Sequence, residues 1–207
     1  MPGSLITSLC RANIAILSQK LALTDVLLQR HGSKGAHAIF QSVCPIVGAS
    51  IGQHFRHSMD HIEIAALVAA ESSPPCPKEA LKPIELHYDL RVRGGTLEKD
   101  MELSINRITS VIDVLHSLSN SCIEGTNEVS VAMVPVHAHF FLSSDQAFEE
   151  PLPSTVAREL GFAAHHAIHH MAMVKIISLQ SCGLHESDLP DHFGRAPSTI
   201  KYDGHSG

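Results

Sequence analysis

The stretch from Arg158 to Met171 constrains this chain most, because it places four of the sixteen histidines within six residues of one predicted helix. Each residue of an α-helix turns by about 100°, so apolar side chains at helical spacing mark the face that packs into a core. That apolar stripe comprises Val156, Leu160, Ala163, Ala167, Met171 and Val174. His166 and His170 lie within its arc. His165 points away from the stripe, and His169 lies at its border.

Two imidazoles four residues apart on a buried face can bind one metal ion together, because such side chains are neighbours on a helix surface. The alternative interpretation is that the buried histidines only form hydrogen bonds in the core. Burying two adjacent polar rings without partners costs more free energy than burying one, which favours a metal site at His166 and His170. Glu159 lies on the same line, two turns earlier, and is a candidate catalytic helper.

The composition bounds the class of protein. A length of 207 residues fits one domain over residues 1–207, with an irregular tail from about residue 184. The chain is 44% hydrophobic, yet no apolar run approaches the ~20 residues that span a bilayer, so we expect a soluble protein with no membrane role. The net charge is −6 with only 15 Lys and Arg, and the absence of a basic cluster argues against a nucleic-acid partner.

The cysteines indicate the compartment. There are five, none in a CxxC spacing, and an odd number argues against a closed disulfide framework. This pattern favours a reducing environment. The N-terminus also lacks the basic region, apolar core and cleavage site of a secretory signal, so the expected location is the cytoplasm.

Four stretches have the apolar periodicity of long helices. They are residues 4–30, 34–70 with an interruption at Pro45 and Gly48, 96–118, and 154–182. His31-Gly32 should end the first and Ser119-Asn120 the third. Ser154 or Thr155 is a good N-cap for the fourth, and Cys182-Gly183 should end it. The Pro- and Ser-rich segment from Ser72 to Pro83 is too long for a tight hairpin and suits a crossover connection.

The segment ELHYDLRVRGG alternates apolar and polar residues, as in a short strand. Asp89, Arg91 and Arg93 would share its polar face. One interpretation makes Asp89 a second catalytic helper and the two arginines a binding site for an anionic group of the substrate. The other is a salt-bridged loop that packs against the end of the helices.

Residues Glu128 to Leu142 are rich in β-branched and aromatic side chains and are broken at Pro135. They predict two short strands in a hairpin between the third and fourth helices. His137 and His139 alternate in this stretch and would share a face. They could form a second pair of metal ligands, although solvent-facing strand histidines are commoner.

The second helix carries three histidines along one edge of its apolar stripe, His54, His57 and His61. At spacings of three and four, any of them could reach a metal held by the last helix. Four long helices with histidines on two inward faces are typical of a ligand site inside a bundle.

These residues also carry a family resemblance. The run from Ser50 to His61, SIGQHFRHSMDH, resembles the second-helix signature of the DinB-like superfamily, in which a Ser-Ile start is followed by a histidine and, three positions later, an acid. His166-Ala167-Ile168-His169-His170 resembles its last-helix HxxHH motif. The resemblance implies a four-helix bundle with long crossover connections. It also implies a divalent metal, commonly nickel or zinc, held by His57, His166 and His170. From spacing alone, His54 and His61 remain alternatives to His57.

The resemblance also suggests an activity. The superfamily includes transferases that add bacillithiol, mycothiol or glutathione to electrophiles, an isomerase of a thiol conjugate and a metal-binding domain in ergothioneine synthesis. Three neutral imidazoles leave open positions on an ion, as in catalytic sites. We therefore expect a metal-dependent enzyme acting on a small molecule with a low-molecular-weight thiol.

Two alternatives stand beside the enzyme. One is a non-catalytic bundle that binds a metal or a small molecule, acting as a homodimer, and the other is a bundle whose histidines hold no metal. The family's widespread ending HHRGQ is replaced here by His169-His170-Met171-Ala172-Met173, so the Arg and Gln that follow the histidines are missing.

Overall fold

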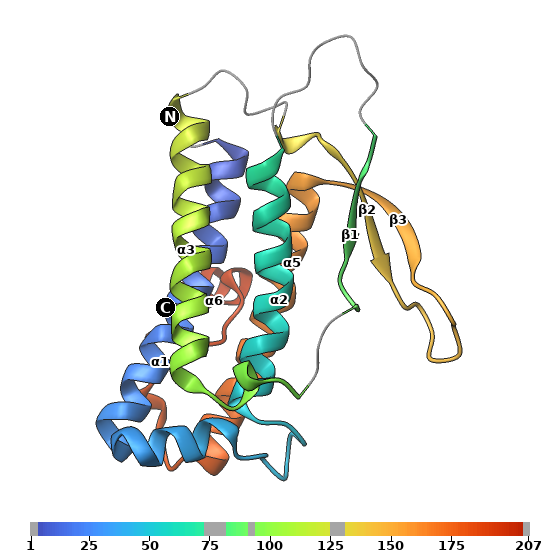
Figure 1. The fold of residues 1–207 in the computed structure, drawn as a ribbon. Coiled ribbons are helices and arrows are strands. Elements are labelled where there is room, and N and C mark those ends of the chain that lie inside the picture. Colours follow the sequence, from blue (N-terminus) through green and yellow to red (C-terminus); the bar gives the residue numbers. More distant parts are fainter. Residues whose placement is uncertain (1–3, 73–81, 91–93, 125–130, 205–207) are drawn as a thin grey trace. The chain divides into compact units, whose positions relative to one another are not determined.

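The computed structural model describes residues 4–72, 82–90, 94–124 and 131–204, and these residues are mostly helical with one small sheet. The α-helices are α1 (Leu5–Gln41), α2 (Ile51–Glu71), α3 (Met101–Glu124), α5 (Val156–Ser181) and α6 (Pro197–Asp203), and the 3₁₀ turns are η1 (Thr96–Glu98) and η2 (Glu186–Asp188) (Figure 1). The strands are β1 (Ile84–His87), β2 (Pro135–Phe140) and β3 (Glu150–Thr155). None of the helices in this part of the chain is long and apolar enough to cross a membrane.

The chain divides into two compact units, and each of the four long helices contributes to both. The first, here called the sheet unit, comprises Met1–Ile14, Asp60–Arg93 and Ser110–Ala164. The second, called the histidine unit, comprises Ala15–Met59, Gly94–Thr109 and His165–Gly207.

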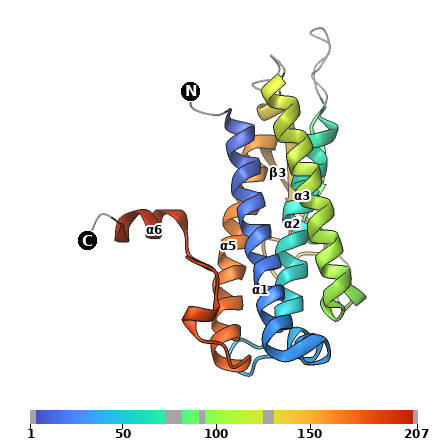
Figure 2. The same cartoon turned by 90° about the vertical axis from the view of Figure 1, so that its left-hand side faces the viewer.

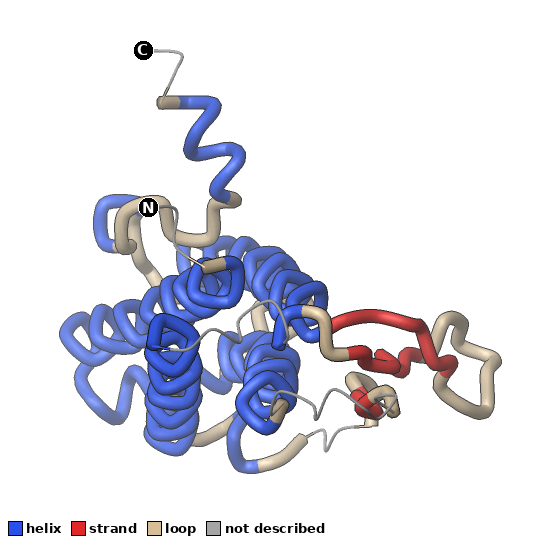
Figure 3. The backbone as a smooth tube through the Cα atoms, turned by 90° about the horizontal axis from the view of Figure 1, so that it is seen from above, coloured by secondary structure: helices blue, strands red, loops and turns tan. Residues whose placement is uncertain are grey.

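In the sheet unit the strands lie in the order β1-β2-β3. β1 pairs with β2 in parallel, and β2 pairs with β3 in antiparallel fashion. Leu86, Val136 and Ala138 are buried on one face, as expected for strands whose side chains alternate between a core and an outer face. Figure 3 shows the three strands together, with the loop between β2 and β3 leading away from them.

The predicted hairpin between the third and fourth helices is present, but its strands are not the predicted ones. Both were expected within residues 128–142, whereas β2 pairs with residues 150–155. Pro135 begins β2 instead of breaking it, because a proline at the first position of a strand removes no needed donor. Pro151 and Pro153 lie in β3, an edge strand, where missing N–H groups are tolerated. The predicted all-α fold with a small hairpin therefore agrees with the mostly helical chain, and the sheet has one strand more than predicted.

The helix ends follow local signals in most places. Gly32 has φ 67° and interrupts α1 at the predicted break. Thr155 caps α5, its hydroxyl accepting the N–H of Arg158 at 3.4 Å, and Gly183 follows the helix with φ 64°.

The predicted stop at Ser119-Asn120 is wrong, since α3 continues to Glu124. Ser119 is buried, so packing overrides its weak helix preference.

The tail is more regular than predicted. Figure 2 shows the chain after α5 turning back toward that helix before α6 leads away from it. Phe193 is buried, and the N–H of Gly194 donates to Gln19 Oε1 at 3.2 Å, which attaches this segment to α1.

In the histidine unit, buried polar contacts hold α2 against its neighbours. Lys20 of α1 is fully buried, and its ammonium donates to the Phe55 carbonyl at 3.2 Å and to Ser58 Oγ at 2.6 Å. Arg56 forms a buried ion pair with Glu98 at 2.6 Å. Each contact ties α2 to a segment far away in the sequence.

Gly52 allows α2 to approach η1. A methyl group at this position would lie 2.0 Å from the carbonyl oxygen of Glu98 and 2.7 Å from Phe40 Cε1. We expect Gly52→Ala to lower the free energy of unfolding by roughly 2 kcal/mol or more, because backbone must move to relieve the overlap. Urea denaturation measures this change.

Gly161→Ala is the matched control, since its added methyl group would meet only Leu9 Cδ2 at 3.6 Å. Alanine is the better helix former, so this variant should be more stable by about 0.5–1 kcal/mol. Equal effects at the two glycines would contradict the close approach of α2 to η1.

Candidate metal centre

Three imidazole nitrogens converge in the histidine unit, one from α2 and two from α5. Nε2 of His166 lies 3.1 Å from Nε2 of His57 and 3.1 Å from Nε2 of His170. The ring centroids of His57 and His170 are 4.5 Å apart. All three rings are half-buried. The structure thus brings together the three histidines expected to be metal ligands.

The donor set fits a divalent transition metal. Zinc–nitrogen bonds of about 2.0–2.1 Å place two nitrogens of one coordination sphere roughly 2.9–3.4 Å apart, depending on the angle between them. The observed separations of 3.1 Å fall within that range. His57, His166 and His170 could therefore hold one ion with little movement of their rings.

The pKa values of His170 and His54 favour the neutral forms of these two rings. Burial, followed by the proximity of His57 and His166, lowers the pKa of His170 to about 2. Burial also lowers the pKa of His54, with smaller effects from His169 and Lys20. Since metal ligation requires a neutral imidazole, His170 keeps its lone pair available throughout the physiological pH range.

His54 lies behind His170 and not at the point of convergence. Its Nδ1 is 2.8 Å from Nδ1 of His170. When Nε2 of His170 carries a lone pair, the proton lies on Nδ1 and is donated to His54. Metal-ligating histidines commonly use their second nitrogen in this way, which fixes the ring orientation. The geometry therefore gives His54 a positioning role and places His57 with the other two candidates.

His165 and His169 are exposed, as their positions on the helix predicted. His61 belongs to the sheet unit, where it is buried and stacks on Tyr88 with ring centroids 4.6 Å apart.

Glu159, predicted as a catalytic helper, is a buried acceptor in the sheet unit. Its carboxylate accepts hydrogen bonds from the Tyr88 hydroxyl at 2.8 Å and from Ser154 Oγ at 2.5 Å. Arg158 forms an ion pair with it at 2.7 Å. Burial, and then the adjacent carboxylate, raise the pKa of Tyr88. These contacts give Glu159 a structural role, because they join β3 and the chain after β1 to α5.

Asp89, the second predicted helper, also makes structural contacts. Its backbone N–H donates to Glu149 Oε1 at 3.0 Å, and its carboxylate accepts the N–H of Phe141 at 3.1 Å. Asp89 therefore holds both ends of the loop between β2 and β3. Arg91 and Arg93 lie outside the described residues.

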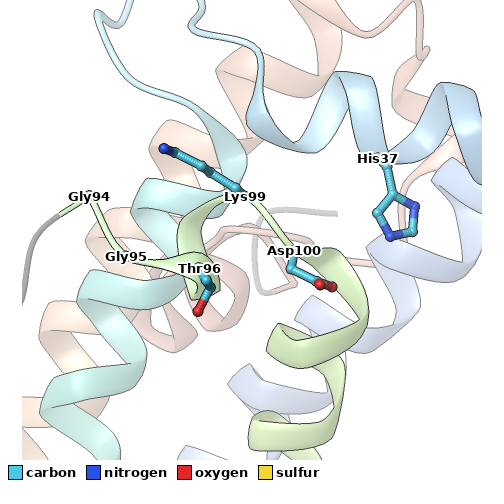
Figure 4. Close-up of a pocket in the computed structure, with 6 residues that line it drawn as sticks. All are labelled: His37, Gly94, Gly95, Thr96, Lys99 and Asp100. Atoms are coloured by element: carbon cyan, nitrogen blue, oxygen red, sulfur yellow. The ribbon is translucent and has the colours of Figure 1, made fainter.

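A separate open cavity of about 340 Å³ lies in the histidine unit beside the start of α3. It is lined by His37, Gly94, Gly95, Thr96, Lys99 and Asp100. Figure 4 shows Lys99 directed away from Asp100 and His37, so no functional group set converges there. Among the described residues, none of the predicted site residues lines this cavity.

Sequence reasoning considered His137 and His139 as a second pair of ligands but missed His87 and Glu149, which lie beside His139. The period-two spacing of Glu85 with His87, and of His137 with His139, was the available signal. Only the pairing of β1 with β2 shows that Glu85 and His87 lie beside His137 and His139.

Comparison with known proteins leaves the family open. No protein-family model matches the sequence, and no solved structure matches it. Over 117 residues the chain is 30% identical to FK506-binding protein 5 of Rhizopus delemar. The match covers 56% of this chain and 27% of that protein, so the chain spans about a quarter of the length of this curated relative. Functional inference therefore depends on the site geometry.

The lowered pKa of His170 predicts a pH dependence of stability in metal-free protein. The unfolded chain takes up a proton at this residue as the pH falls below about 6.5, whereas the folded protein does not. Stability is therefore lost as the pH falls. Between pH 7.5 and pH 5.5 we expect this group to lower the free energy of unfolding by about 1.4 kcal/mol.

Urea denaturation in the presence of a chelator measures this dependence. His170→Gln should remove that part of it, because glutamine does not ionise, whereas the exposed His165→Gln should retain it. The same pH dependence in His170→Gln and the wild type would contradict the assignment.

Proposed function

We propose that this protein binds a divalent metal ion through His57, His166 and His170. The observation that carries the proposal is the convergence of three Nε2 atoms, with separations of 3.1 Å from His166 to each of the others. The same three residues are the ligands that the DinB-like resemblance implies. We therefore also propose that the chain is a DinB-like four-helix bundle with long crossover connections.

The donor set favours nickel or zinc. Three imidazoles without a carboxylate suit borderline transition metals and not magnesium or calcium, which prefer oxygen ligands. His54 supports this choice, since its contact with Nδ1 of His170 directs the other nitrogen of that ring toward the cluster.

We further propose that the site is catalytic and that a low-molecular-weight thiol is one substrate. When bound, a divalent ion with open positions supplies Lewis acidity and lowers the pKa of a thiol or water. Burial raises the pKa of Cys10 to about 12 and that of Cys182 to about 11, so neither thiol is a nucleophile at neutral pH. We therefore propose a thiol from solution, and not Cys10 or Cys182, as the nucleophile.

A non-catalytic metal-binding protein is the second candidate. It is favoured by the residues that follow His170, since Met171 is buried and Ala172 and Met173 carry no charge or hydrogen-bonding group. The residues that replace the family's Arg and Gln therefore supply no polar contact to a substrate. A homodimer and a cytoplasmic location remain expectations.

Metal content tests the site directly. Protein purified without a histidine tag should carry nickel or zinc, and His166→Ala should lose about one ion per chain, as measured by plasma mass spectrometry. His165→Ala removes an exposed neighbouring imidazole and should keep the ion. Equal metal content in the two variants would refute the proposed ligands.

Thiol conjugation tests the activity. The metal-loaded protein is incubated with monobromobimane and, separately, with bacillithiol, mycothiol and glutathione. We expect conjugation with one of them at a rate that falls at least 100-fold in His166→Ala and is unchanged in His165→Ala, because only the former loses the metal. If no thiol reacts faster than in the protein-free control while the metal is retained, the non-catalytic function is the correct one.

A further inference from the structure

The outer face of the sheet carries a second group of metal-binding side chains. Parallel pairing places Glu85 beside His137 and His87 beside His139. Leu86, between the two β1 residues, is buried on the opposite face. Paired residues share a face of the sheet. Glu85 and His87 of β1 therefore lie next to His137 and His139 of β2.

These side chains are already in contact. The rings of His87 and His139 stack with centroids 4.2 Å apart. Nδ1 of His87 lies 2.6 Å from Glu149 Oε2. Glu85 contacts both His139 and His137, at 3.1 Å from the latter. The cluster therefore contains imidazoles and carboxylates from β1, from β2 and from the loop before β3.

Glu149 is held in place by the backbone. Its side chain is only 4% exposed although the surrounding face is open to solvent. The N–H of Asp89 donates to Glu149 Oε1 at 3.0 Å, which leaves Oε2 directed at His87. The carboxylate of Asp89 in turn accepts the N–H of Phe141. A carboxylate fixed in this way is positioned for a ligand before the ligand binds.

We propose that His87, His139 and Glu149 form a second site for a divalent transition metal ion of the zinc class. One ligand atom from each residue lies within 4.8 Å of the others. Glu85 adjoins His139 and supplies a further carboxylate beside the site. The site belongs to the sheet unit and shares no residue with the three-histidine centre in the histidine unit, so it does not rest on the proposed function.

The ligand types decide the class of metal. Two imidazoles with one carboxylate are typical of zinc and related transition metals, whereas magnesium and calcium prefer oxygen donors only. With neutral histidines, Glu85 and Glu149 leave two negative charges on this face, which a divalent cation would neutralise.

Ion pairing between histidines and glutamates is the alternative explanation of the same contacts. The two explanations predict different effects of added zinc. If these residues form a metal site, bound zinc displaces the proton between His87 and Glu149. If they form only ion pairs, added zinc leaves the rings of His87 and His139 unchanged at any concentration.

Zinc titration of the full-length, metal-free protein at pH 7.5 tests the proposal, with Zn²⁺ alone as the probe. Calorimetry should find one site fewer, or at least tenfold weaker binding at one site, in His87→Ala/Glu149→Gln than in the wild type. His116→Ala removes an exposed imidazole from α3 in the same unit and should behave as the wild type. Glu149→Gln alone, which keeps an acceptor for the Asp89 N–H, should also weaken this site. Circular dichroism verifies that each variant is folded.

Nitrogen-15 spectra of the imidazoles give a second readout that does not depend on variants. We expect the ¹⁵N shifts of His87 and His139 to move to values of metal-bound rings as zinc is added. Unmoved shifts together with unchanged stoichiometry in His87→Ala/Glu149→Gln would overturn the sheet site. Failure of the three-histidine centre is distinguishable, because it would appear as wild-type stoichiometry in His166→Ala.

Discussion

The convergence of three imidazole nitrogens depends on how α2 is held within the histidine unit. Lys20 bonds the Phe55 carbonyl and Ser58 Oγ, which lie on either side of His57 in the sequence. Arg56, the immediate neighbour of His57, is paired with Glu98, and Gly52 allows close approach to the Glu98 backbone. Buried charges need such partners because an unpaired charge in a core costs several kcal/mol. These contacts therefore set the rotation of α2 and direct His57 toward the two histidines of α5.

The same principle explains residues that looked catalytic. Glu159 and Asp89 are acids next to apolar or aromatic residues, a pattern that suits general bases as well as buried structural acceptors. In the structure, Glu159 accepts hydrogen bonds from the buried Tyr88 hydroxyl and from Ser154, whereas Asp89 accepts one from an exposed backbone N–H of the loop after β2. Buried donors require acceptors in any fold. The donors that these two carboxylates accept from are therefore known only from the tertiary structure.

Much of the helical structure and two of the three residues of the candidate metal centre followed from periodicity. The apolar stripe selected His166 and His170 from four histidines, and both lie in the cluster, whereas His165 and His169 are exposed. Gly32 and Gly183 mark helix ends by their positive φ values. The end of α3 was misjudged because Ser119 is buried, and a local propensity worth a fraction of a kcal/mol cannot outweigh that packing. The pairing of β1 with β2 joins residues about fifty positions apart, and nothing local specifies it.

By itself, the sequence determined which segments are helical and which side of each helix faces inward, because helical geometry repeats every 3.6 residues whatever surrounds it. It left three histidines of α2 equally placed as ligands. The tertiary structure distinguishes two of them, placing Nε2 of His57 near Nε2 of His166 and Nδ1 of His54 near Nδ1 of His170. It also assembled the His87, His139 and Glu149 cluster from two strands and a loop. Both outcomes depend on distances between segments remote in the chain, which only packing sets.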